Sequence, residues 1–277
     1  MSNAIGLFDS GAGGLSVLKK AIDRIHNKNF VYLGDTKRMP YGVRSPEEIK
    51  NFTIEAMGFL QDKGVDLSVI ACNTATCHGL DASQNRYDYP ILGIISWGSI
   101  DSVKVTHNRK IALIGTESTV KSKVYDNTIK SLDSGIELRS IACPDLVLAV
   151  ERGEFEEKHM EKIIRNHLNE FGDFDYDTII LGCTHFPVVK DSFKKIYKKD
   201  NRNVKIINPA HLSIERAMEI LSIEKDNEPI DNRTIDFYIT GDVEAFKHTL
   251  NQVLDLNGFK LSFHQVDLSS FDKYLKK

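Results

Sequence analysis

Asp66-Leu-Ser-Val-Ile-Ala-Cys72-Asn73-Thr74 is echoed 111 residues later by Asp177-Thr-Ile-Ile-Leu-Gly-Cys183-Thr184-His185. In both stretches a cysteine lies six residues after an aspartate, an apolar run separates them, and small polar residues follow. A weaker pair, Ile5-Gly-Leu-Phe-Asp9-Ser10 and Ile111-Ala-Leu-Ile-Gly115-Thr116, has a similar separation of 106 residues. Two strand-to-helix modules that recur in the same order indicate duplication of an α/β unit.

The rest of the chain alternates short apolar runs with amphipathic helices, which is typical of an α/β protein with mainly parallel sheets. One helix is clearly marked, because Ser45, Pro46 and Glu48 fit the N-cap, N1 and N3 positions of a capping box. Another is expected to open at Pro187, after the second cysteine. We therefore expect two pseudo-symmetric lobes, each a mainly parallel sheet flanked by helices, with buried strands at residues 5–8, 30–33, 67–71, 91–95, 111–114 and 178–181.

Composition excludes several functional classes. The 277 residues include 36 Lys+Arg and 39 Asp+Glu, so the net charge of −3 gives no electrostatic footprint for nucleic acid. No apolar run approaches the roughly 18 residues that a membrane span needs. The four cysteines are too few for a disulfide framework and, with no signal-peptide pattern at the start, they predict a reducing, cytoplasmic location.

Several reactive or polar residues follow predicted strands directly. They are Asp9, Asp35, Cys72, Thr116 and Cys183. Ligands of open α/β sheets bind at the carboxyl ends of the strands, so these side chains are expected around one crevice. If the two lobes face each other, Cys72 and Cys183 approach one ligand from opposite sides.

The two cysteines in matched contexts are candidates for reactive thiols. Each precedes a predicted helix start, where the helix dipole and free N–H groups lower a thiol pKa, and His185 adjoins Cys183. A free cysteine is more often a small buried hydrophobe, and that interpretation suits Cys77 and Cys143, which lack the matching context. For Cys72 and Cys183 the repeated context favours chemistry.

Metal and redox roles fit the sequence less well. Cys72, Cys77, His78, Cys183 and His185 are suitable zinc ligand types, but their spacing does not form two close ligand pairs. No C-x-x-C motif supports a redox dithiol. We expect no metal.

Gly11-Ala-Gly-Gly-Leu-Ser16, followed by Asp35, resembles a dinucleotide fingerprint after a strand. Ser16 stands where the third glycine is needed for close helix packing, so the match is incomplete. A glycine-rich turn before a helix still suits an anion, and a substrate carboxylate is the expected occupant.

Inversion at a carbon atom explains the two cysteines in matched contexts better than a metal site, a redox dithiol or a dinucleotide site does. One thiolate removes a proton from one face of a small molecule, and an opposing thiol returns a proton to the other face. This chemistry requires no cofactor. Neutral hydrogen-bonding side chains suited to carboxylates and an ammonium group surround the two cysteines: Ser10, Asn73, Thr74, Thr116, Thr119 and Thr184.

Four blocks of sequence together resemble the glutamate racemases of the aspartate/glutamate racemase superfamily. They are Phe8-Asp-Ser-Gly-Ala-Gly-Gly-Leu15, Gly34-Asp-Thr36 with Pro40-Tyr-Gly42, Ala71-Cys-Asn-Thr-Ala-Thr76, and Leu181-Gly-Cys-Thr-His-Phe-Pro187. The resemblance implies cofactor-independent interconversion of L- and D-glutamate, which supplies D-glutamate for peptidoglycan, by a homodimeric enzyme. It also implies lobes at residues 1–97 plus 207–277 and at residues 98–206, with the active site in the cleft between them.

The same resemblance assigns residues to roles. The acid/base cysteines correspond to Cys72 and Cys183, helped by Asp9, Glu151 and His185. The implied substrate contacts are Asp9, Ser10, Tyr41, Gly42, Asn73, Thr74, Thr184 and His185, with Thr116 and Thr119 as secondary candidates. The position of His185 beside one thiol suggests that it assists Cys183, and that Asp9 assists Cys72.

Other interpretations of these residues and of the whole chain stay open from sequence. Asp9 is also a plausible helix N-cap, and Glu151 lies in a charged stretch. Ser96-Trp-Gly98 and Asn208-Pro209 depart from the family pattern near the expected lobe crossings. A sister racemase of aspartate or hydantoin type and a non-catalytic amino-acid or metal-binding protein are the alternative functions.

Overall fold

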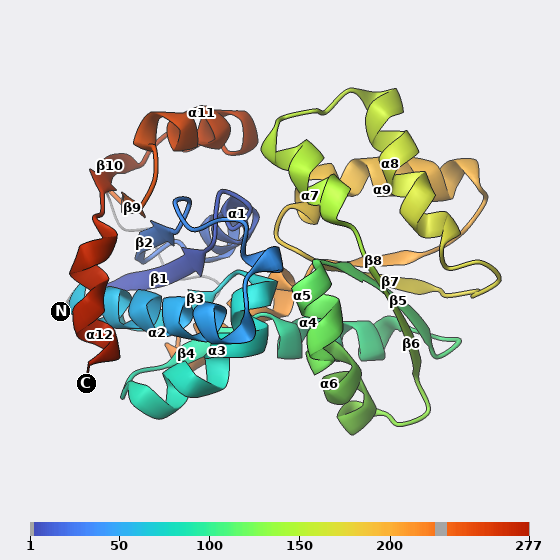
Figure 1. Ribbon diagram of the computed structural model, residues 1–277, viewed down its shortest axis with the longest axis horizontal. Helices are drawn as coiled ribbons and strands as arrows, with labels where there is room; N and C mark the ends of the chain where they lie inside the picture. Colours follow the sequence, from blue (N-terminus) through green and yellow to red (C-terminus); the bar gives the residue numbers. More distant parts are fainter. Residues whose placement is uncertain (1–2, 225–231, 277) are drawn as a thin grey trace.

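Two parallel sheets form the framework of the protein (Figure 1), whose computed structural model describes residues 3–224 and 232–276. The six-stranded sheet has the order β10-β9-β2-β1-β3-β4, and the four-stranded sheet has the order β6-β5-β7-β8. Every strand pair is parallel. The strands are β1 (Ala4–Asp9), β2 (Asn29–Gly34), β3 (Leu67–Ile70), β4 (Ile91–Gly93), β5 (Lys110–Gly115), β6 (Glu137–Ala142), β7 (Thr178–Gly182), β8 (Lys205–Ile207), β9 (Thr234–Ile239) and β10 (Lys260–Gln265).

Helices flank both sheets, as the α/β pattern predicts (Figure 1). The α-helices are α1 (Leu15–Arg24), α2 (Pro46–Asp62), α3 (Asn73–Arg86), α4 (Ile95–Val105), α5 (Glu117–Ser122), α6 (Val124–Leu132), α7 (Pro144–Glu151), α8 (Glu157–Asn169), α9 (Lys190–Lys199), α10 (Ala210–Ile220), α11 (Val243–Val253) and α12 (Asp272–Leu275). The 3₁₀ turns in the described part of the chain are η1 (Tyr41–Val43), η2 (Phe186–Val189) and η3 (Leu268–Phe271). Within the described ranges, no helix is both long and apolar enough to cross a membrane.

The two sheets repeat one strand order. The order β2-β1-β3-β4 in the larger sheet matches β6-β5-β7-β8 in the smaller one. The paired sequence stretches therefore lie on equivalent strands, because Cys72 follows β3 and Cys183 follows β7. The echo in the sequence corresponds to a repeated topology.

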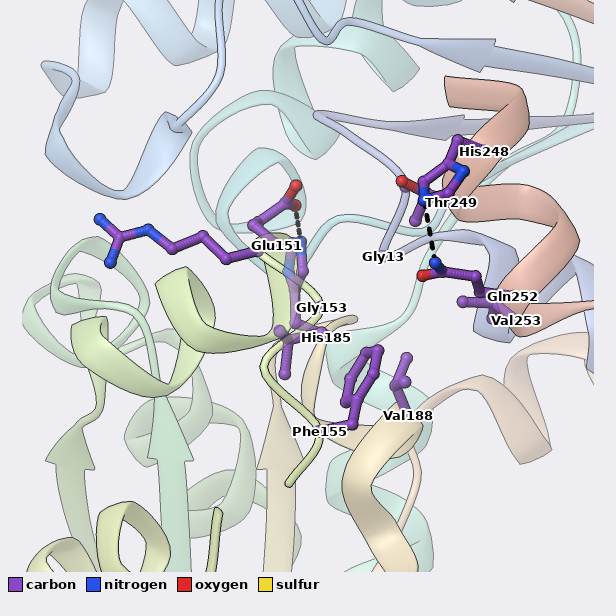
Figure 2. Close-up of a pocket in the computed structure, with 13 residues that line it drawn as sticks. Gly13, Glu151, Gly153, Phe155, His185, Val188, His248, Thr249, Gln252 and Val253 are labelled. Carbon is purple, nitrogen blue, oxygen red and sulfur yellow. Dashed lines mark hydrogen bonds and ion pairs between the residues drawn. The ribbon is translucent and has the colours of Figure 1, made fainter. Parts of the chain in front are cut away.

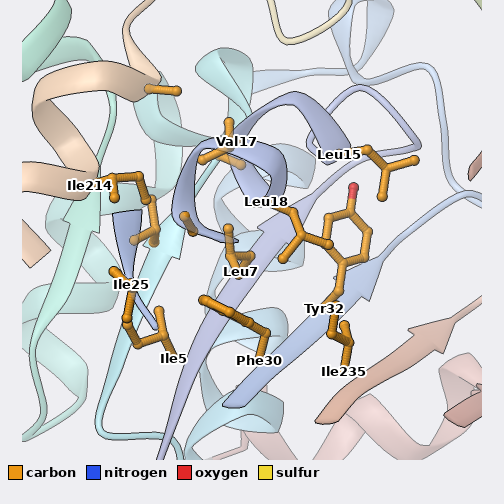
Figure 3. Close-up of a cluster of buried hydrophobic side chains, with 14 of the residues drawn as sticks. Ile5, Leu7, Leu15, Val17, Leu18, Ile25, Phe30, Tyr32, Ile214 and Ile235 are labelled. Atoms are coloured by element: carbon orange, nitrogen blue, oxygen red, sulfur yellow. The ribbon is translucent and has the colours of Figure 1, made fainter. Parts of the chain in front are cut away.

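Both faces of the larger sheet are buried at the central strands β1, β2 and β3, which explains their nearly continuous apolar sequences. Along β1, Leu7 packs on the face covered by α1 and α10, whereas Phe8 packs on the face covered by α2. Figure 3 shows the first cluster, with Leu18 from α1 and Ile214 from α10 over the strand residues Leu7 and Phe30. The alternation of side chains along each strand thus supplies two cores at once.

The predicted capping box of α2 is confirmed. The Ser45 Oγ accepts a hydrogen bond from the Glu48 backbone N–H at 3.3 Å, and the Ser45 backbone N–H donates to Glu48 Oε2 at 2.9 Å. These reciprocal bonds satisfy backbone donors at the helix start.

Two boundaries differ from the sequence prediction in the type of element that is formed. The strand expected over residues 91–95 ends at Gly93, and α4 begins at Ile95; both Ile94 and Ile95 are buried, so hydrophobicity does not mark the change. The helix expected to open at Pro187 begins as the 3₁₀ turn η2, because the Phe186 N–H bonds the Cys183 carbonyl in a tight turn. The α-helix α9 starts only at Lys190, although Phe193 and Ile196 are buried as expected.

The segments that connect the two sheets lie against each other. Gly98 in α4 packs on Pro209, where a Cβ on Gly98 would lie 2.8 Å from the proline Cβ. Gly98 and Pro209 belong to the stretches Ser96-Trp-Gly98 and Asn208-Pro209. These two stretches therefore meet in space, at the crossings between the sheets.

Candidate active site

A cavity of about 270 Å³ lies where the carboxyl ends of strands from both sheets converge. Loops and helix starts after β1, β2 and β3 contribute one side, and those after β5, β6 and β7 contribute the other. Its lining residues are Ser10, Met39, Pro40, Tyr41, Gly42, Val43, Cys72, Asn73, Thr74, Thr116, Glu117, Pro144, Val147, Leu148, Glu151, Cys183, Thr184 and His185. Both cysteines in matched contexts therefore reach one cavity, as the strand-end argument predicts.

Cys183 begins a chain of polar contacts on its side of the cavity. Its Sγ lies 3.3 Å from His185 Nδ1, and His185 Nε2 hydrogen-bonds Glu151 Oε1 at the end of α7. Burial lowers the pKa of His185, but the Cys183 sulfur and the Glu151 carboxylate outweigh it and hold that pKa well above its ordinary value. The His185 imidazole is thus held toward its protonated, positively charged form, with its Nδ1 3.3 Å from the Cys183 sulfur.

Cys72 has different surroundings. It is the N-cap of α3, where its Sγ accepts a hydrogen bond from the Ala75 N–H at 3.4 Å and lies 3.6 Å from Ser10 Oγ. Burial, with a smaller contribution from Asp9, raises the pKa of Cys72 to about 12. The Ala75 N–H at the helix start does lower this pKa, but the expected net lowering is wrong, because desolvation outweighs the two hydrogen bonds. Cys72 is therefore a protonated thiol.

Asp9 lies behind the cavity wall and is completely buried. Its carboxylate accepts hydrogen bonds from the Gly11 N–H at 2.9 Å and from the Thr184 hydroxyl at 3.1 Å. Burial raises the pKa of Asp9, whereas the charge of His185 lowers it. Asp9 is not the N-cap of α1, a position held by Gly14. Its own carboxylate bonds the Gly11 N–H of the glycine-rich turn.

Apart from Glu117, neutral hydrogen-bonding groups form the rest of the polar lining. Thr74 Oγ1 lies 2.9 Å from Thr116 Oγ1 and 3.3 Å from Thr119 Oγ1. The Tyr125 hydroxyl donates to Asn73 Oδ1 at 2.8 Å, while Asn73 Nδ2 is buried without a hydrogen-bond partner among the residues that the structure describes. The free amide N–H of Asn73 is available to a ligand carboxylate, because buried donors are rarely left unpaired.

A comparison with known proteins identifies the family. The model of the Asp/Glu/hydantoin racemases matches residues 9–217. The chain belongs to this family. The racemase is 36% identical over 260 residues to glutamate racemase of Listeria monocytogenes, across 92% of this chain and 96% of the relative. It is 38% identical over 253 residues to glutamate racemase 2 of Caldanaerobacter subterraneus, across 91% and 94% of the two chains.

Solved structures agree with this membership. A glutamate racemase isoform from Bacillus anthracis superposes with a TM-score of 0.87 at 34% identity, covering 96% of this chain and 98% of that one. The glutamate racemase of Francisella tularensis, solved with D-glutamate, gives a TM-score of 0.86 at 29% identity, covering 97% and 99%. The chain is thus an amino-acid racemase, an isomerase, and the alternative of a non-catalytic binding protein is wrong.

The racemase brings almost all the predicted site residues together. Asp9 and Thr119 do not line the cavity, but each is one hydrogen bond behind a residue that does, Thr184 and Thr74 respectively. Sequence reasoning missed the apolar part of the wall, which consists of Met39, Pro40, Val43, Pro144, Val147 and Leu148. It also missed Tyr125, because no local pattern in α6 shows that its hydroxyl meets Asn73 on α3.

The remaining cysteines lie outside this cavity. Cys77 accepts a hydrogen bond from the Ser122 hydroxyl at 3.2 Å, and burial raises its pKa to about 11. Cys143 is fully buried in the core of the smaller sheet. Across residues 3–224 and 232–276, no group of three or more His, Cys, Asp or Glu side chains is arranged to hold a metal ion.

A second, smaller pocket of about 130 Å³ lies on the other side of the Glu151–His185 pair. Figure 2 shows this pair, joined by a dashed line, across from His248, Thr249 and Gln252 of α11. Glu151 and His185 therefore border both pockets of the racemase, and Glu151 keeps 21% of its side-chain surface exposed.

Proposed function

We propose that the racemase interconverts L- and D-glutamate without a cofactor, by a two-base mechanism in which Cys72 and Cys183 act on opposite faces of Cα. One observation carries this proposal: the two thiols line one cavity from equivalent strands of the two sheets, and each has its own set of polar partners. Racemisation requires removal of a proton from one face of Cα and delivery of a proton to the other face, and two thiols on opposite sides of one cavity suit both steps.

Cys183 is the base when the substrate presents its Cα hydrogen on that side. The Cα–H bond breaks, an S–H bond forms on Cys183, and the electron pair stays on Cα. The His185 imidazolium at 3.3 Å stabilises the thiolate before the transfer, and the Glu151 carboxylate stabilises the imidazolium.

Cys72 completes the inversion from the opposite face. Its raised pKa keeps the proton on sulfur, so the thiol is ready to donate. The S–H bond breaks and a new C–H bond forms on Cα, which leaves a thiolate. Ser10 and the Ala75 N–H lie within hydrogen-bond distance of that sulfur and stabilise its charge. The reverse reaction exchanges the two roles.

Hydrogen bonds stabilise the carbanion between these steps. The α-proton of an amino acid is very weakly acidic, so the developing charge must spread into the α-carboxylate and meet fixed donors there. The amino end of α3, the free Asn73 amide N–H and the hydroxyl of Thr74 supply such donors, whereas the Thr184 hydroxyl donates to Asp9. Asp9 accepts a hydrogen bond from Thr184 and so fixes its position, and it assists Cys72 in proton transfer.

Glutamate is the substrate that the relatives favour, since the curated and solved relatives described above are named glutamate racemases. The cavity's neutral donors suit a substrate with two carboxylates.

The biological role that follows from this substrate is supply of D-glutamate for peptidoglycan, in the cytoplasm, by a homodimer. Residues 1–97 with 207–277, and residues 98–206, would then form the two lobes around the cavity.

A circular-dichroism assay with L-glutamate and no added cofactor tests the proposal. We expect the signal to decay to zero as the racemic mixture forms, at the same rate after exhaustive chelation. Decay with L-aspartate or a hydantoin and none with L-glutamate would instead assign the sister activity. Loss of activity on chelation would contradict the cofactor-free mechanism.

A further inference from the structure

Asp35 and its neighbours form a buried charge cluster that the proposed mechanism does not use. Asp35 follows β2 and is fully buried, and its backbone N–H donates to the Asp9 carbonyl at 3.0 Å. Its Oδ2 accepts hydrogen bonds from Arg38 Nε at 2.6 Å and from the Tyr41 hydroxyl, while its Oδ1 accepts from the Thr240 hydroxyl at 2.8 Å. Both oxygens of this carboxylate thus accept hydrogen bonds from side chains of the protein.

Arg38 is the centre of the cluster. Its guanidinium pairs with Asp35 through Nε and with Glu55 of α2 through Nη1, and only 13% of its side chain is exposed. The guanidinium carbon also lies 3.9 Å from the centre of the Phe52 ring. A planar group held by two carboxylates and an aromatic face has one orientation, which lysine cannot reproduce.

The chain directly after Arg38 forms a wall of the substrate cavity. Every residue from 39 to 43, here called the wall segment, lines that cavity, whereas Arg38 does not. The Tyr41 side chain is held in place by the cluster, because its buried ring packs on Phe52 and its hydroxyl donates a hydrogen bond to Asp35. The cluster therefore holds the wall segment at its start, through Arg38, and at its middle, through Tyr41.

The wall segment also touches the groups on either side of it. A Cβ on Gly42 would lie 3.2 Å from Thr116 Cβ, so the segment contacts the opposite side of the cavity closely. A Cβ on Gly11 would lie 2.6 Å from Met39 Sδ, so Met39, at the start of the wall segment, packs closely against the glycine-rich turn. A shift of the wall segment therefore changes the width of the cavity.

We propose that Arg38 is a positioning residue that sets substrate affinity by fixing the wall segment, without touching the substrate. The two cysteines are placed by other elements, the start of α3 and the end of β7. Loss of Arg38 therefore weakens binding in the ground state and the transition state alike, which raises KM and leaves kcat nearly unchanged. This inference rests on the proposed glutamate racemisation.

Steady-state kinetics of Arg38→Met and Arg38→Lys test the proposal. Since loss of uniform binding raises KM without changing kcat, we expect Arg38→Met to raise KM for L-glutamate about tenfold and to change kcat by less than about twofold. Arg38→Lys keeps the charge but not the planar fork, so it should raise KM by less. Thermal unfolding of each variant is measured alongside.

Arg233→Met is the matched control. Arg233 is also a half-buried guanidinium, 4.5 Å from the Phe259 ring, but it precedes β9 at the opposite end of the sheet and bonds the Ile25 and Lys28 carbonyls. An unchanged KM in Arg38→Met, or an equal rise in Arg233→Met, would overturn the proposal. If Arg38→Met does not fold, an unchanged KM in Arg38→Lys overturns it. Absence of glutamate turnover in the wild type tests the proposed function instead.

Discussion

The Thr184 hydroxyl donates a hydrogen bond to the Asp9 carboxylate, with an oxygen-to-oxygen distance of 3.1 Å. Asp9 ends β1 in the larger sheet, and Thr184 follows β7 in the smaller one, directly between Cys183 and His185. The bond therefore joins the larger sheet, which carries Cys72, to the smaller sheet, which carries Cys183. Electrostatics join them as well, since the charge of His185 lowers the pKa of Asp9.

This coupling predicts that His185 affects Asp9. Replacing His185 by Asn removes a positive charge, so the pKa of Asp9, already raised by burial, should rise further. Titration of the Asp9 carboxyl carbon by ¹³C NMR measures the shift in the wild type and in His185→Asn. His248→Asn, which removes a histidine from the far wall of the second pocket, is the control and should leave Asp9 unchanged. A fall in the Asp9 pKa on loss of His185 would disprove the coupling.

Glu151 should matter through His185. Glu151→Gln weakens the support for the imidazolium, so the His185 pKa falls and the Cys183 thiolate loses stabilisation. Because a positioned acid/base group contributes about 10²-fold or more, we expect kcat to fall by about ten- to a hundredfold. Glu154→Gln is the matched control, since Glu154 pairs with His159 and Arg152 away from the thiols. Equal kcat values for the two variants would refute the role of Glu151.

Cys72 should make stability depend on alkaline pH. The folded protein keeps the thiol proton up to a pKa of about 12, whereas the unfolded chain loses it near pH 9. The stabilisation is fully present below the unfolded pKa and is lost as pH rises toward the folded one, at about 1.4 kcal/mol per pH unit. Urea unfolding at pH 8 and pH 10 should therefore show a larger loss for the wild type than for Cys72→Ser. Equal losses would mean that burial does not hold the proton on this sulfur.

The contact between the two crossing segments predicts a steric effect at Gly98. A methyl group there would lie 2.8 Å from Pro209 Cβ and 3.2 Å from its Cα, so either the helix or the crossing must shift. We expect Gly98→Ala to lower the free energy of unfolding by about 1–3 kcal/mol, the usual range for overpacking. Ser96→Ala, on the exposed side of the same helix, should change it by less than about 0.5 kcal/mol. A neutral Gly98→Ala would show that the crossings are not closely packed.

The sequence allows much of this architecture to be predicted, because the signals are local. The repeated aspartate-to-cysteine stretches mark β3 and β7, and the capping box at Ser45 marks the start of α2. The strand-end rule places Cys72 and Cys183 at one cavity before any coordinates are known. The prediction of element boundaries fails where a buried strand is followed by a buried helix start, as at Ile94, and where a tight turn precedes the helix, as at Pro187.

Tertiary features lie beyond such signals. The pKa of Cys72 depends on burial that the helix-dipole argument does not include, and so the sequence predicts the wrong direction. The occupation of the glycine turn by Asp9 depends on a side-chain orientation that no pattern encodes. Arg38 meets Glu55 only because α2 packs beside the end of β2. Each of these features follows from contacts between distant segments.

The two-base mechanism is tested most directly by exchange of the Cα hydrogen in deuterium oxide, with Cys72→Ser and Cys183→Ser and with L- and D-glutamate supplied separately. The mechanism predicts that both variants lose racemisation, and that each retains deuterium exchange with one enantiomer only, the opposite one in the two variants. Racemisation at the wild-type rate in either variant, or exchange of the same enantiomer by both, would contradict it.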